Sequence, residues 1–273
     1  MSGPMDIELA VAAAADRARM AMDIFAPHYV VSMVSGGTDS AAAHAVALEI
    51  GLPITHIIHG RTGCGIEATT DWVREHYGGR QELIVADAGT AYEEYVLRKG
   101  FFGKGIDAHG FAYRILKAGP FRKAVSASIR NGKTGVRVML LNGARKDESP
   151  NRAAHLRRAR PDPASPSNVW FNVIHDWDGA TKDAYLASRG IAINPVARAL
   201  CRSGECMCGT MQSPAERVEA AALYPEWGLW LEELEAEARR KHGFGWGEVK
   251  PKASQLVQGD LFMPMCVDCE PPS

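Results

Sequence analysis

Short apolar runs alternate along this chain with longer segments in which apolar residues recur at helical spacing. The apolar runs, each short enough to form a buried strand, cover 29–34, 54–58, 83–86, 136–141 and 169–174. The helical patterns occupy 5–25, 40–50, 68–77, 90–99 and a long region around 107–130. Strands that alternate with helices are typical of a doubly wound sheet. We therefore predict an α/β fold of Rossmann-like type with five mainly parallel strands.

The character of the chain changes after Pro195. A cysteine-rich turn at 201–209 precedes a Glu-rich helical segment over about 214–242, and the tail that follows is rich in proline. Residues 159–168 contain several prolines and serines and are predicted to form a loop before the last strand. We predict a large α/β domain over 1–195 and a small Cys-rich, helical C-terminal subdomain over 196–273.

Composition narrows the class of protein. The chain has 273 residues, of which 46% are hydrophobic, and this suffices for one large domain with an appendage. Its formal net charge of -1 gives the chain as a whole no affinity for nucleic acid or membrane. No apolar run approaches the roughly 20 residues of a membrane span, and the charges within 5–25 do not suit a signal peptide. We expect a cytoplasmic protein without a disulfide framework.

The most informative segment lies between the first apolar run and the Ala-rich helical pattern, and reads Ser35-Gly36-Gly37-Thr38-Asp39-Ser40. Glycines let a ligand approach the backbone, and the helix that follows presents free N–H groups and the positive end of its dipole. Hydroxyls of Ser35 and Ser40 can donate hydrogen bonds, and Asp39 can cap the helix or help to hold a metal ion. The segment lacks the Gly-Lys-Ser/Thr ending of a Walker loop. We predict that it binds phosphate or pyrophosphate.

A second polar segment follows the fourth apolar run, over 142–152. The guanidinium groups of Arg145 and Arg152 suit bidentate contacts with phosphate, and Gly143 permits close backbone approach. In doubly wound sheets ligands bind beyond the carboxyl ends of the strands, so this segment should meet the loop at 35–40 in one crevice. The second run also ends in polar residues, His59, Arg61 and Thr62-Gly63, at the same predicted edge.

These segments together resemble a known family. The segment 35–40 looks like the pyrophosphate loop of the adenine nucleotide alpha-hydrolases. Residues 143–152 resemble the G-x-R-x-x-[EQ]-S-x-x-R signature of the phosphoadenosine phosphosulfate (PAPS) reductase family, matched at Gly143, Arg145, Glu148, Ser149 and Arg152. Thr62-Gly63 and the stretch from His175 to Asn194-Pro195 are similar to further blocks of that family, in the same order, so the resemblance covers roughly 28–210. Arg61 departs from the acidic residue that relatives carry before the threonine.

The resemblance implies a site for ATP or a related adenine nucleotide, with Mg²⁺. It implies nucleotide contacts from Ser35, Gly36, Gly37, Thr38, Asp39, Ser40, His59, Thr62, Gly63, Gly143 and Arg145. Asp39, Arg145 and Arg152 are then the expected catalytic residues. Members of the group cleave ATP between the α and β phosphates or bind PAPS.

Five of the cysteines gather near the C-terminus: Cys201, Cys206, Cys208, Cys266 and Cys269. C-x-C and C-x-x-C pairs in a chain that is not secreted indicate a metal site, and four thiolates suit either Zn²⁺ or a [4Fe–4S] cluster. The resemblance favours the cluster, because several relatives carry one. We favour Cys206, Cys208, Cys266 and Cys269 as ligands, with Cys201 as the substitute. Cys64 stands apart, beside Thr62-Gly63.

Two stretches without acidic residues, 114–138 and 152–160, concentrate the positive charge of the chain. Such stretches favour a nucleic acid partner despite the neutral balance. The chain resembles in logic the ATP pyrophosphatase component of DNA phosphorothioation systems. We therefore predict an ATP pyrophosphatase that activates a nucleic acid for sulfur incorporation, together with a cysteine desulfurase or another sulfur donor; a homodimer is left open.

Three alternatives remain at this point. A sulfonucleotide reductase would use a C-terminal Glu-Cys-Gly-Leu-His motif, and this chain lacks it, as it lacks the paired adjacent cysteines of cluster-bearing reductases. A sulfate adenylyltransferase subunit would need no cluster. A nucleotide-binding regulatory module without turnover belongs to a different class of protein.

Overall fold

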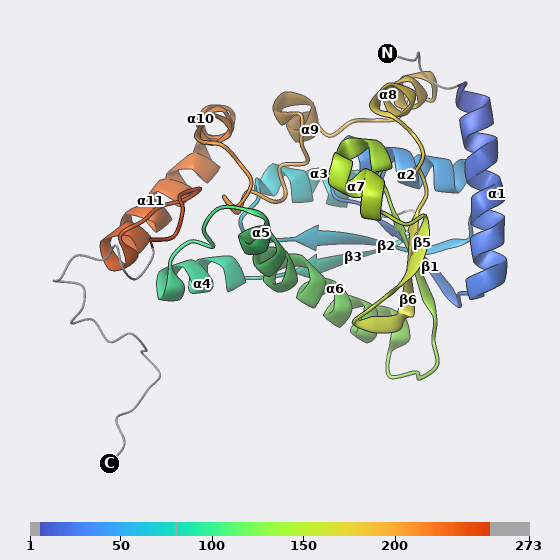
Figure 1. The fold of residues 1–273 in the computed structure, drawn as a ribbon, viewed down its shortest axis with the longest axis horizontal. Coiled ribbons are helices and arrows are strands. Elements are labelled where there is room, and N and C mark those ends of the chain that lie inside the picture. The colour runs from blue at the N-terminus through green and yellow to red at the C-terminus, as the bar shows by residue number, and fades with distance from the viewer. Residues whose placement is uncertain (1–5, 80, 252–273) are drawn as a thin grey trace.

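The computed structural model describes residues 6–79 and 81–251, and nothing is described of the side chains of Asn151 and Arg152. A six-stranded sheet forms its centre (Figure 1), in the order β3-β2-β1-β4-β6-β5. The strands are β1 (Tyr29–Met33), β2 (Ile54–Arg61), β3 (Glu82–Asp87), β4 (Val138–Asn142), β5 (Ala159–Asp162) and β6 (Ser165–Asn172). All neighbours pair in parallel except β5 and β6. The predicted doubly wound, mainly parallel α/β class is confirmed.

The prediction of five strands with a loop over 159–168 is wrong. Residues of that segment form β5, whose Ala159 and Arg160 pair with Phe171 and Trp170 of β6 in antiparallel register. The composition of this segment did not predict a strand, because Pro161 has no backbone N–H and cannot donate a hydrogen bond to a neighbouring strand. Proline is tolerated at the edge of a sheet, and β5 is an edge strand. Pairing with the largely buried β6 therefore decided the conformation.

Helices follow the predicted pattern over the first hundred residues, as α1 (Ile7–Phe25), α2 (Thr38–Glu49), α3 (Glu67–Tyr77) and α4 (Ala91–Lys99). The long helical region is continuous and contains two π-helical stretches, in the order α5 (Ile106–Tyr113), η1 (Arg114–Ala118), α6 (Gly119–Ala124) and η2 (Val125–Arg130). Short helices then surround the later strands: η3 (Lys146–Glu148), α7 (Pro150–His155), α8 (Gly179–Ser188) and α9 (Pro195–Leu200). A π-helical turn often marks a functional site.

The segment predicted as one helix over 214–242 is divided. It forms α10 (Pro214–Leu223) and α11 (Pro225–His242), and Tyr224 between them is not helical, with φ -133° and ψ 75°. Pro225 causes the break, because proline disfavours helical geometry in the residue before it. Ser213 and Glu216 form a capping box at the start of α10.

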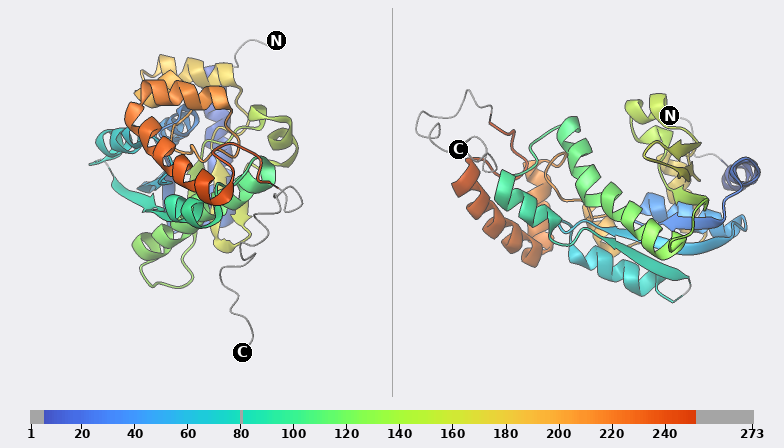
Figure 2. Two further views of the ribbon diagram at one scale, coloured as in Figure 1. Left: turned by 90° about the vertical axis from the view of Figure 1, so that its left-hand side faces the viewer. Right: turned by 90° about the horizontal axis from the view of Figure 1, so that it is seen from below.

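Alternating residues of the strands fill two cores on opposite faces of the sheet. Val30, Met139 and Leu141 face α1, α2 and α8, whereas Val31 and Leu140 face the helical region that ends at Arg130. Helices accordingly lie on both sides of the sheet in Figures 1 and 2. Both faces of the central strands are buried, as expected of a parallel sheet.

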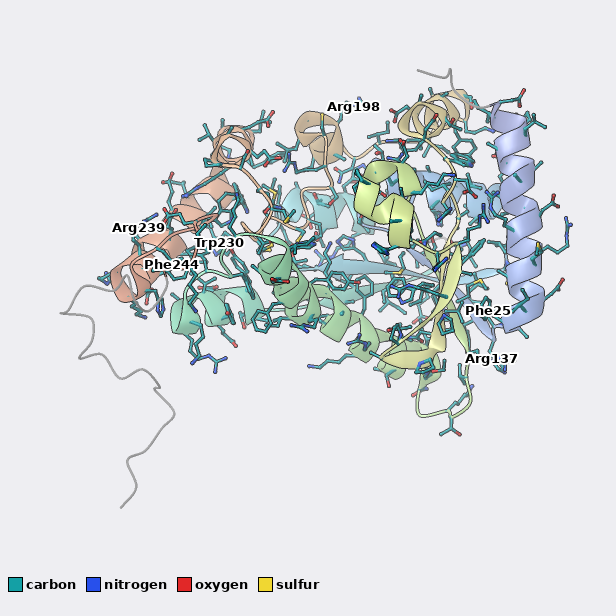
Figure 3. The ribbon with its side chains drawn as sticks, viewed as in Figure 1. Phe25, Arg137, Arg198, Trp230, Arg239 and Phe244 are labelled. Carbon is teal, nitrogen blue, oxygen red and sulfur yellow. The ribbon has the colours of Figure 1, made fainter. Side chains whose placement is uncertain are left out.

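A further hydrophobic cluster joins the C-terminal helices to the rest of the chain. It combines Tyr92 of α4 and Leu116 of η1 with Val196, Trp227 and Leu231. Trp230 and Phe244 lie at this end of the molecule, opposite Phe25 and Arg137 (Figure 3). The cluster contains residues from before and after residue 195. The division of the chain into two domains at this residue stays a prediction.

In the parts of the chain that the structure describes, no helix combines the length and the apolar character needed to cross a bilayer.

Candidate phosphate-binding site and neighbouring thiols

The chain order of the strands reverses at β1. From β1 the chain proceeds to β2 and β3 on one side, and then crosses to β4 on the other. In open α/β sheets the crevice for a ligand lies at this point, beyond the carboxyl ends of the two central strands. The loop at 35–40 follows β1 and the segment beginning at Gly143 follows β4. The topology therefore brings the two predicted segments together.

Hydrogen bonds within the loop hold its shape. The backbone N–H of Ser35 donates to Oγ of Ser40 at 3.1 Å, and this hydroxyl lies 2.9 Å from the carbonyl oxygen of Gly37. Gly36 has φ +76°, and a Cβ there would come within 2.7 Å of Thr69 Cγ2. Glycine is thus required at position 36 by both conformation and space. No side chain of the described residues caps the N-terminus of α2 at Gly37, and its backbone N–H groups suit an anion.

Gly143 is required for packing. A Cβ at this position would lie 2.3 Å from the carbonyl oxygen of Asp39 and 2.9 Å from the backbone nitrogen of Ser40. The absence of a side chain lets the segment after β4 contact the first turn of α2. This close approach sets the position of Arg145, two residues further on.

Arg145 and Asp39 form the central ion pair of the crevice. Nε of Arg145 lies 2.7 Å from Oδ1 of Asp39, and Arg145 is 8% exposed. Its Nη1 finds no hydrogen-bond partner among the described residues and lies 3.5 Å from a carboxylate oxygen of Asp147. The backbone N–H of Arg145 donates to Glu148 at 2.8 Å, which fixes the start of η3. Arg152 lies in α7, and its predicted contact stays a prediction because its side chain is outside the described residues.

A second cation at the loop was missed by sequence reasoning. Lys182 of α8 places its Nζ 3.0 Å from Oγ1 of Thr38 and 3.9 Å from Oδ1 of Asp39. Lys182 falls within the stretch 175–195 that resembles a family block, but nothing in that stretch singled it out, because its position depends on how α8 packs beside α2.

A cavity of about 360 Å³ opens beside the loop. Ser35, Asp39, Ser40 and Gly143 line one side of it, and the remaining wall includes aromatic and basic residues, Tyr113, Lys117, Phe121 and Trp170. This volume is within the range of small-molecule sites. A smaller cavity of about 200 Å³ shares Tyr113, Phe121 and Trp170 and adds Arg122 and Arg160. Aromatic rings beside a phosphate loop suit a nucleotide base.

His59 and Thr62 do not line this cavity. Nδ1 of His59 lies 2.9 Å from the carbonyl oxygen of Val34, and the histidine is fully buried. The backbone N–H of Thr62 donates at 2.7 Å to Oε1 of Glu205, a carboxylate that is 2% exposed. The first bond joins β2 to the residue after β1, and the second attaches the end of β2 to the cysteine-rich loop. Direct contact of His59 or Thr62 with a nucleotide stays a prediction.

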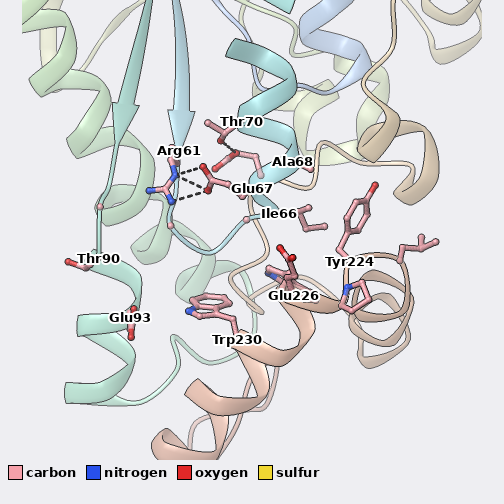
Figure 4. A pocket seen from close by; sticks show the side chains of 17 residues that line it. Arg61, Ile66, Glu67, Ala68, Thr70, Thr90, Glu93, Tyr224, Glu226 and Trp230 are labelled. Carbon is pink, nitrogen blue, oxygen red and sulfur yellow. Dashed lines mark hydrogen bonds and ion pairs between the residues drawn. The ribbon is translucent and has the colours of Figure 1, made fainter. Parts of the chain in front are cut away.

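Gly63 and Arg61 line a different and larger cavity, of about 790 Å³, between α3, α4 and α11 (Figure 4). Arg61 is engaged there by Glu67 at 2.9 Å and by Asp87 at 3.2 Å. Trp230 and Glu226 of α11 form the opposite wall. Arg61, the residue that departs from the family pattern, is thus held by carboxylates away from the loop at 35–40.

The cysteine-rich loop packs on the loop at 35–40. A Cβ at Gly37 would lie 3.3 Å from Cβ of Ser203, and Oγ1 of Thr69 donates to the carbonyl oxygen of Ser203 at 2.7 Å. Sγ of Cys206 lies 3.9 Å from Sγ of Cys208. The predicted pair of thiols therefore lies next to the crevice.

Cys64 lies beside the thiols of Cys206 and Cys208, although it is distant from them in the sequence. It is fully buried and interacts with the side chain of Cys206, whereas Cys201 is exposed. Hydrogen bonds with Cys208 and Cys64 lower the pKa of Cys206 well below its ordinary value, and the charges of Lys117 and His109 act in the same direction. Burial raises the pKa of Cys64.

Cys266 and Cys269 lie outside the described residues, so their part in a metal site stays a prediction. Within residues 6–79 and 81–251, no group of three or more His, Cys, Asp or Glu side chains is arranged to hold a metal ion. The described thiols thus supply at most part of a ligand set.

The fold and the loop define a doubly wound α/β protein with a glycine-rich loop and a cavity beyond its central strands. The model of the phosphoadenosine phosphosulfate reductase domain matches residues 29–211, and the chain belongs to this family. The predicted family is thereby confirmed. A solved structure of PAPS reductase from Candida auris, in a phosphate complex, is similar with 16% identity and a TM-score of 0.47, over 68% of this chain and 83% of that one. No curated protein matches the chain.

Proposed function

We propose that this protein binds ATP in the crevice between β1 and β4 and cleaves it between the α and β phosphates, transferring the adenylyl group to an acceptor that then receives sulfur. The observation that carries this proposal is the meeting of Arg145 with Asp39 at the N-terminus of α2, beside a cavity of about 360 Å³. Family membership supports an adenine nucleotide as the ligand.

The proposed reaction is a displacement at the α phosphorus. An acceptor oxygen attacks, the bond to the bridging oxygen breaks, and pyrophosphate leaves with the electron pair. Free N–H groups at the start of α2 and the guanidinium of Arg145 stabilise the charge that develops on the pyrophosphate. We assign Arg152 to the same task. A sulfur nucleophile then displaces AMP from the acceptor.

We propose two cofactors. Mg²⁺ would screen the phosphates, with Asp39 as its protein ligand, because carboxylate oxygens suit this ion. A [4Fe–4S] cluster would be held by Cys206 and Cys208 together with Cys266 and Cys269, and zinc is the alternative for the same thiols. The close approach of Cys206 and Cys208 beside the crevice supports a thiolate site there.

We propose a nucleic acid as the acceptor. Arg122 and Arg160, from the two basic stretches, line one cavity that adjoins the proposed nucleotide site. Phosphate contacts from such residues supply sequence-independent affinity. A sulfur donor such as a cysteine desulfurase is required for the second step.

Sulfonucleotide reduction is the second candidate, favoured by the family and by the lowered pKa of Cys206. The Cys206 thiolate would attack the sulfur of the sulfonucleotide and release the adenine nucleotide. A second thiol, for which Cys208 is the nearest described candidate, would then form a disulfide with Cys206 and release sulfite. The two thiols supply the two electrons.

One assay separates the two candidates. The anaerobically prepared protein is incubated with ATP or with PAPS, with and without DNA or tRNA, and AMP and sulfite are measured. We expect AMP from ATP, stimulated by nucleic acid, and a loss of about 100-fold or more in turnover for Arg145→Ala, as for removal of a donor to a developing anion. Sulfite from PAPS without AMP from ATP would establish the reductase instead.

The matched control for Arg145→Ala is Arg74→Ala, because Arg74 lies on the exposed surface of α3, where it forms ion pairs with Glu67 and Asp71 of the same helix. It should retain the activity of the wild type. Arg160→Glu should abolish the stimulation by nucleic acid and leave the basal rate of AMP formation unchanged. Equal AMP formation by Arg145→Ala and the wild type would contradict the proposed site.

A further inference from the structure

We propose that Lys182 is the lysine that binds the terminal phosphates of the nucleotide, a role for which the loop at 35–40 has no lysine of its own. The inference rests on the proposed function only in that a polyphosphate must bind at this loop. Lys182 belongs to α8, far along the chain from the loop.

The position of Lys182 is fixed on three sides. Its Nζ lies 3.0 Å from Oγ1 of Thr38, 2.9 Å from Oδ1 of Asp183 and 3.9 Å from Oδ1 of Asp39. Asp178 caps the start of α8 by accepting a hydrogen bond from the N–H of Thr181 at 2.7 Å, which holds the turn that carries Lys182. The lysine is 8% exposed, which is rare for this residue type.

The surroundings of the Lys182 ammonium include a helix N-terminus and a second cation. Thr38 is the first residue of α2, so Lys182 places a buried cation at the positive end of the helix dipole, where positive charge is unfavourable. Arg145 approaches the same oxygen of Asp39, so two cations and a helix N-terminus share that carboxylate.

The other carboxylates near Lys182 and Arg145 offset the positive charge of these two side chains only weakly. The side chains of Asp147 and Asp183 are 55% and 69% exposed, so water screens their charges. Asp39 is thus the carboxylate that the two cations share, and a bound phosphate would neutralise them further.

A second observation also indicates an anion at this place. Among the described residues, the buried Nη1 of Arg145 has no hydrogen-bond partner and only an ion-pair contact of 3.5 Å with Asp147, whereas buried donors are ordinarily satisfied. A Cβ built at Gly179, the first residue of α8, would lie 4.0 Å from this nitrogen, so the donor lies against the helix that carries Lys182. A phosphate group can accept from both side chains.

Lysine suits this task because its ammonium is a compact charge on a flexible stem. Its contact with the exposed Asp183 is an ion pair that a phosphate can replace at low cost. Lys182 thus takes the place of the lysine that a Walker loop carries within its own sequence.

The test compares binding of ATP, inorganic pyrophosphate and AMP to the full chain by calorimetry. Lys182→Met retains the length of the side chain and removes the charge. We expect binding of ATP and pyrophosphate to weaken by about 10- to 100-fold, the range for loss of a charged hydrogen bond. AMP, which lacks the terminal phosphates, should bind within about twofold of its affinity for the wild type, and Lys182→Arg should restore part of the loss.

Lys133→Met, at an exposed lysine before β4, is the matched control and should leave all three affinities unchanged. Equal weakening of AMP and ATP by Lys182→Met would mean that the lysine only supports the loop, and unchanged ATP binding would also overturn the inference. A wild-type protein that binds neither ATP nor pyrophosphate would reject the proposed function itself, and this outcome is distinct from the other two.

Discussion

At the residue scale, Gly143 controls how closely β4 and α2 approach. The place of a Cβ at this position is occupied by backbone atoms of Asp39, which cannot move as a side chain can. The same contact positions Arg145 against Asp39. A single methyl group here therefore affects both the packing and the proposed site.

Gly143→Ala should lower the free energy of unfolding by about 1–3 kcal/mol, the usual range for overpacking, and should weaken ATP binding as α2 is displaced. Urea unfolding and calorimetry measure the two effects. Gly110→Ala is the control, because Gly110 lies in α5 with open space around its Cβ position. That substitution should raise stability by roughly 0.5–1 kcal/mol. A Gly143→Ala protein as stable as the wild type would refute the packing role.

At the scale of elements, Asp176 joins several segments around the end of β6. Its carboxylate lies 2.9 Å from Arg158, 3.3 Å from Lys146 of η3 and 3.5 Å from Arg17 of α1. Burial alone would raise the pKa of Asp176, but hydrogen bonds from Arg158 and His175 outweigh it and hold this pKa well below the usual range. The ionised carboxylate therefore stabilises the fold.

Asp176→Asn should reduce the free energy of unfolding at pH 7 by about 1 kcal/mol, a modest value because Arg158 and Lys146 are solvated. A lowered folded-state pKa gives stability that is present above the unfolded value of about 3.9 and is lost as pH falls toward the folded value. The difference between wild type and variant should therefore shrink below about pH 4. Urea unfolding over a pH series measures it, and a constant difference from pH 7 to pH 3 would argue against this linkage.

At the scale of the whole molecule, three thiols from two distant segments meet beside the crevice. Cys64 follows β2, whereas Cys206 and Cys208 follow α9. Trp227 of α11 donates a hydrogen bond to the carbonyl oxygen of Cys64 at 3.1 Å and so ties the last described helix to this place. The thiol site therefore depends on docking of the C-terminal helices.

For the anaerobically purified protein we expect bound iron and broad absorbance from the proposed cluster. Cys206→Ala should lose the iron, whereas Cys201→Ala should keep it, because Cys201 is exposed and Cys206 lies among the other thiols. Metal analysis and the visible spectrum give the result. Zinc in place of iron would establish the alternative metal, and full iron content in Cys206→Ala would remove Cys206 from the ligand set.

The sequence alone determined the local features of this protein. Alternating apolar runs and helical patterns predicted the α/β class, because burial on both faces requires continuous apolar strands. The loop at 35–40 and the segment at 142–152 were predicted as neighbours, since the carboxyl ends of adjacent parallel strands meet at one edge. Both predictions depend on short-range pattern and on general topology.

Tertiary structure decided what depends on contacts between distant segments. β5 became a strand through its pairing with β6, despite Pro161. Cys64, in the loop before α3, and Lys182 of α8 reached the site through tertiary packing, and no residue pattern in the sequence singled either of them out. His59 and Thr62 were drawn into bonds with buried groups of other segments. A side chain's partners across the fold are set by packing, which no local pattern of residues encodes.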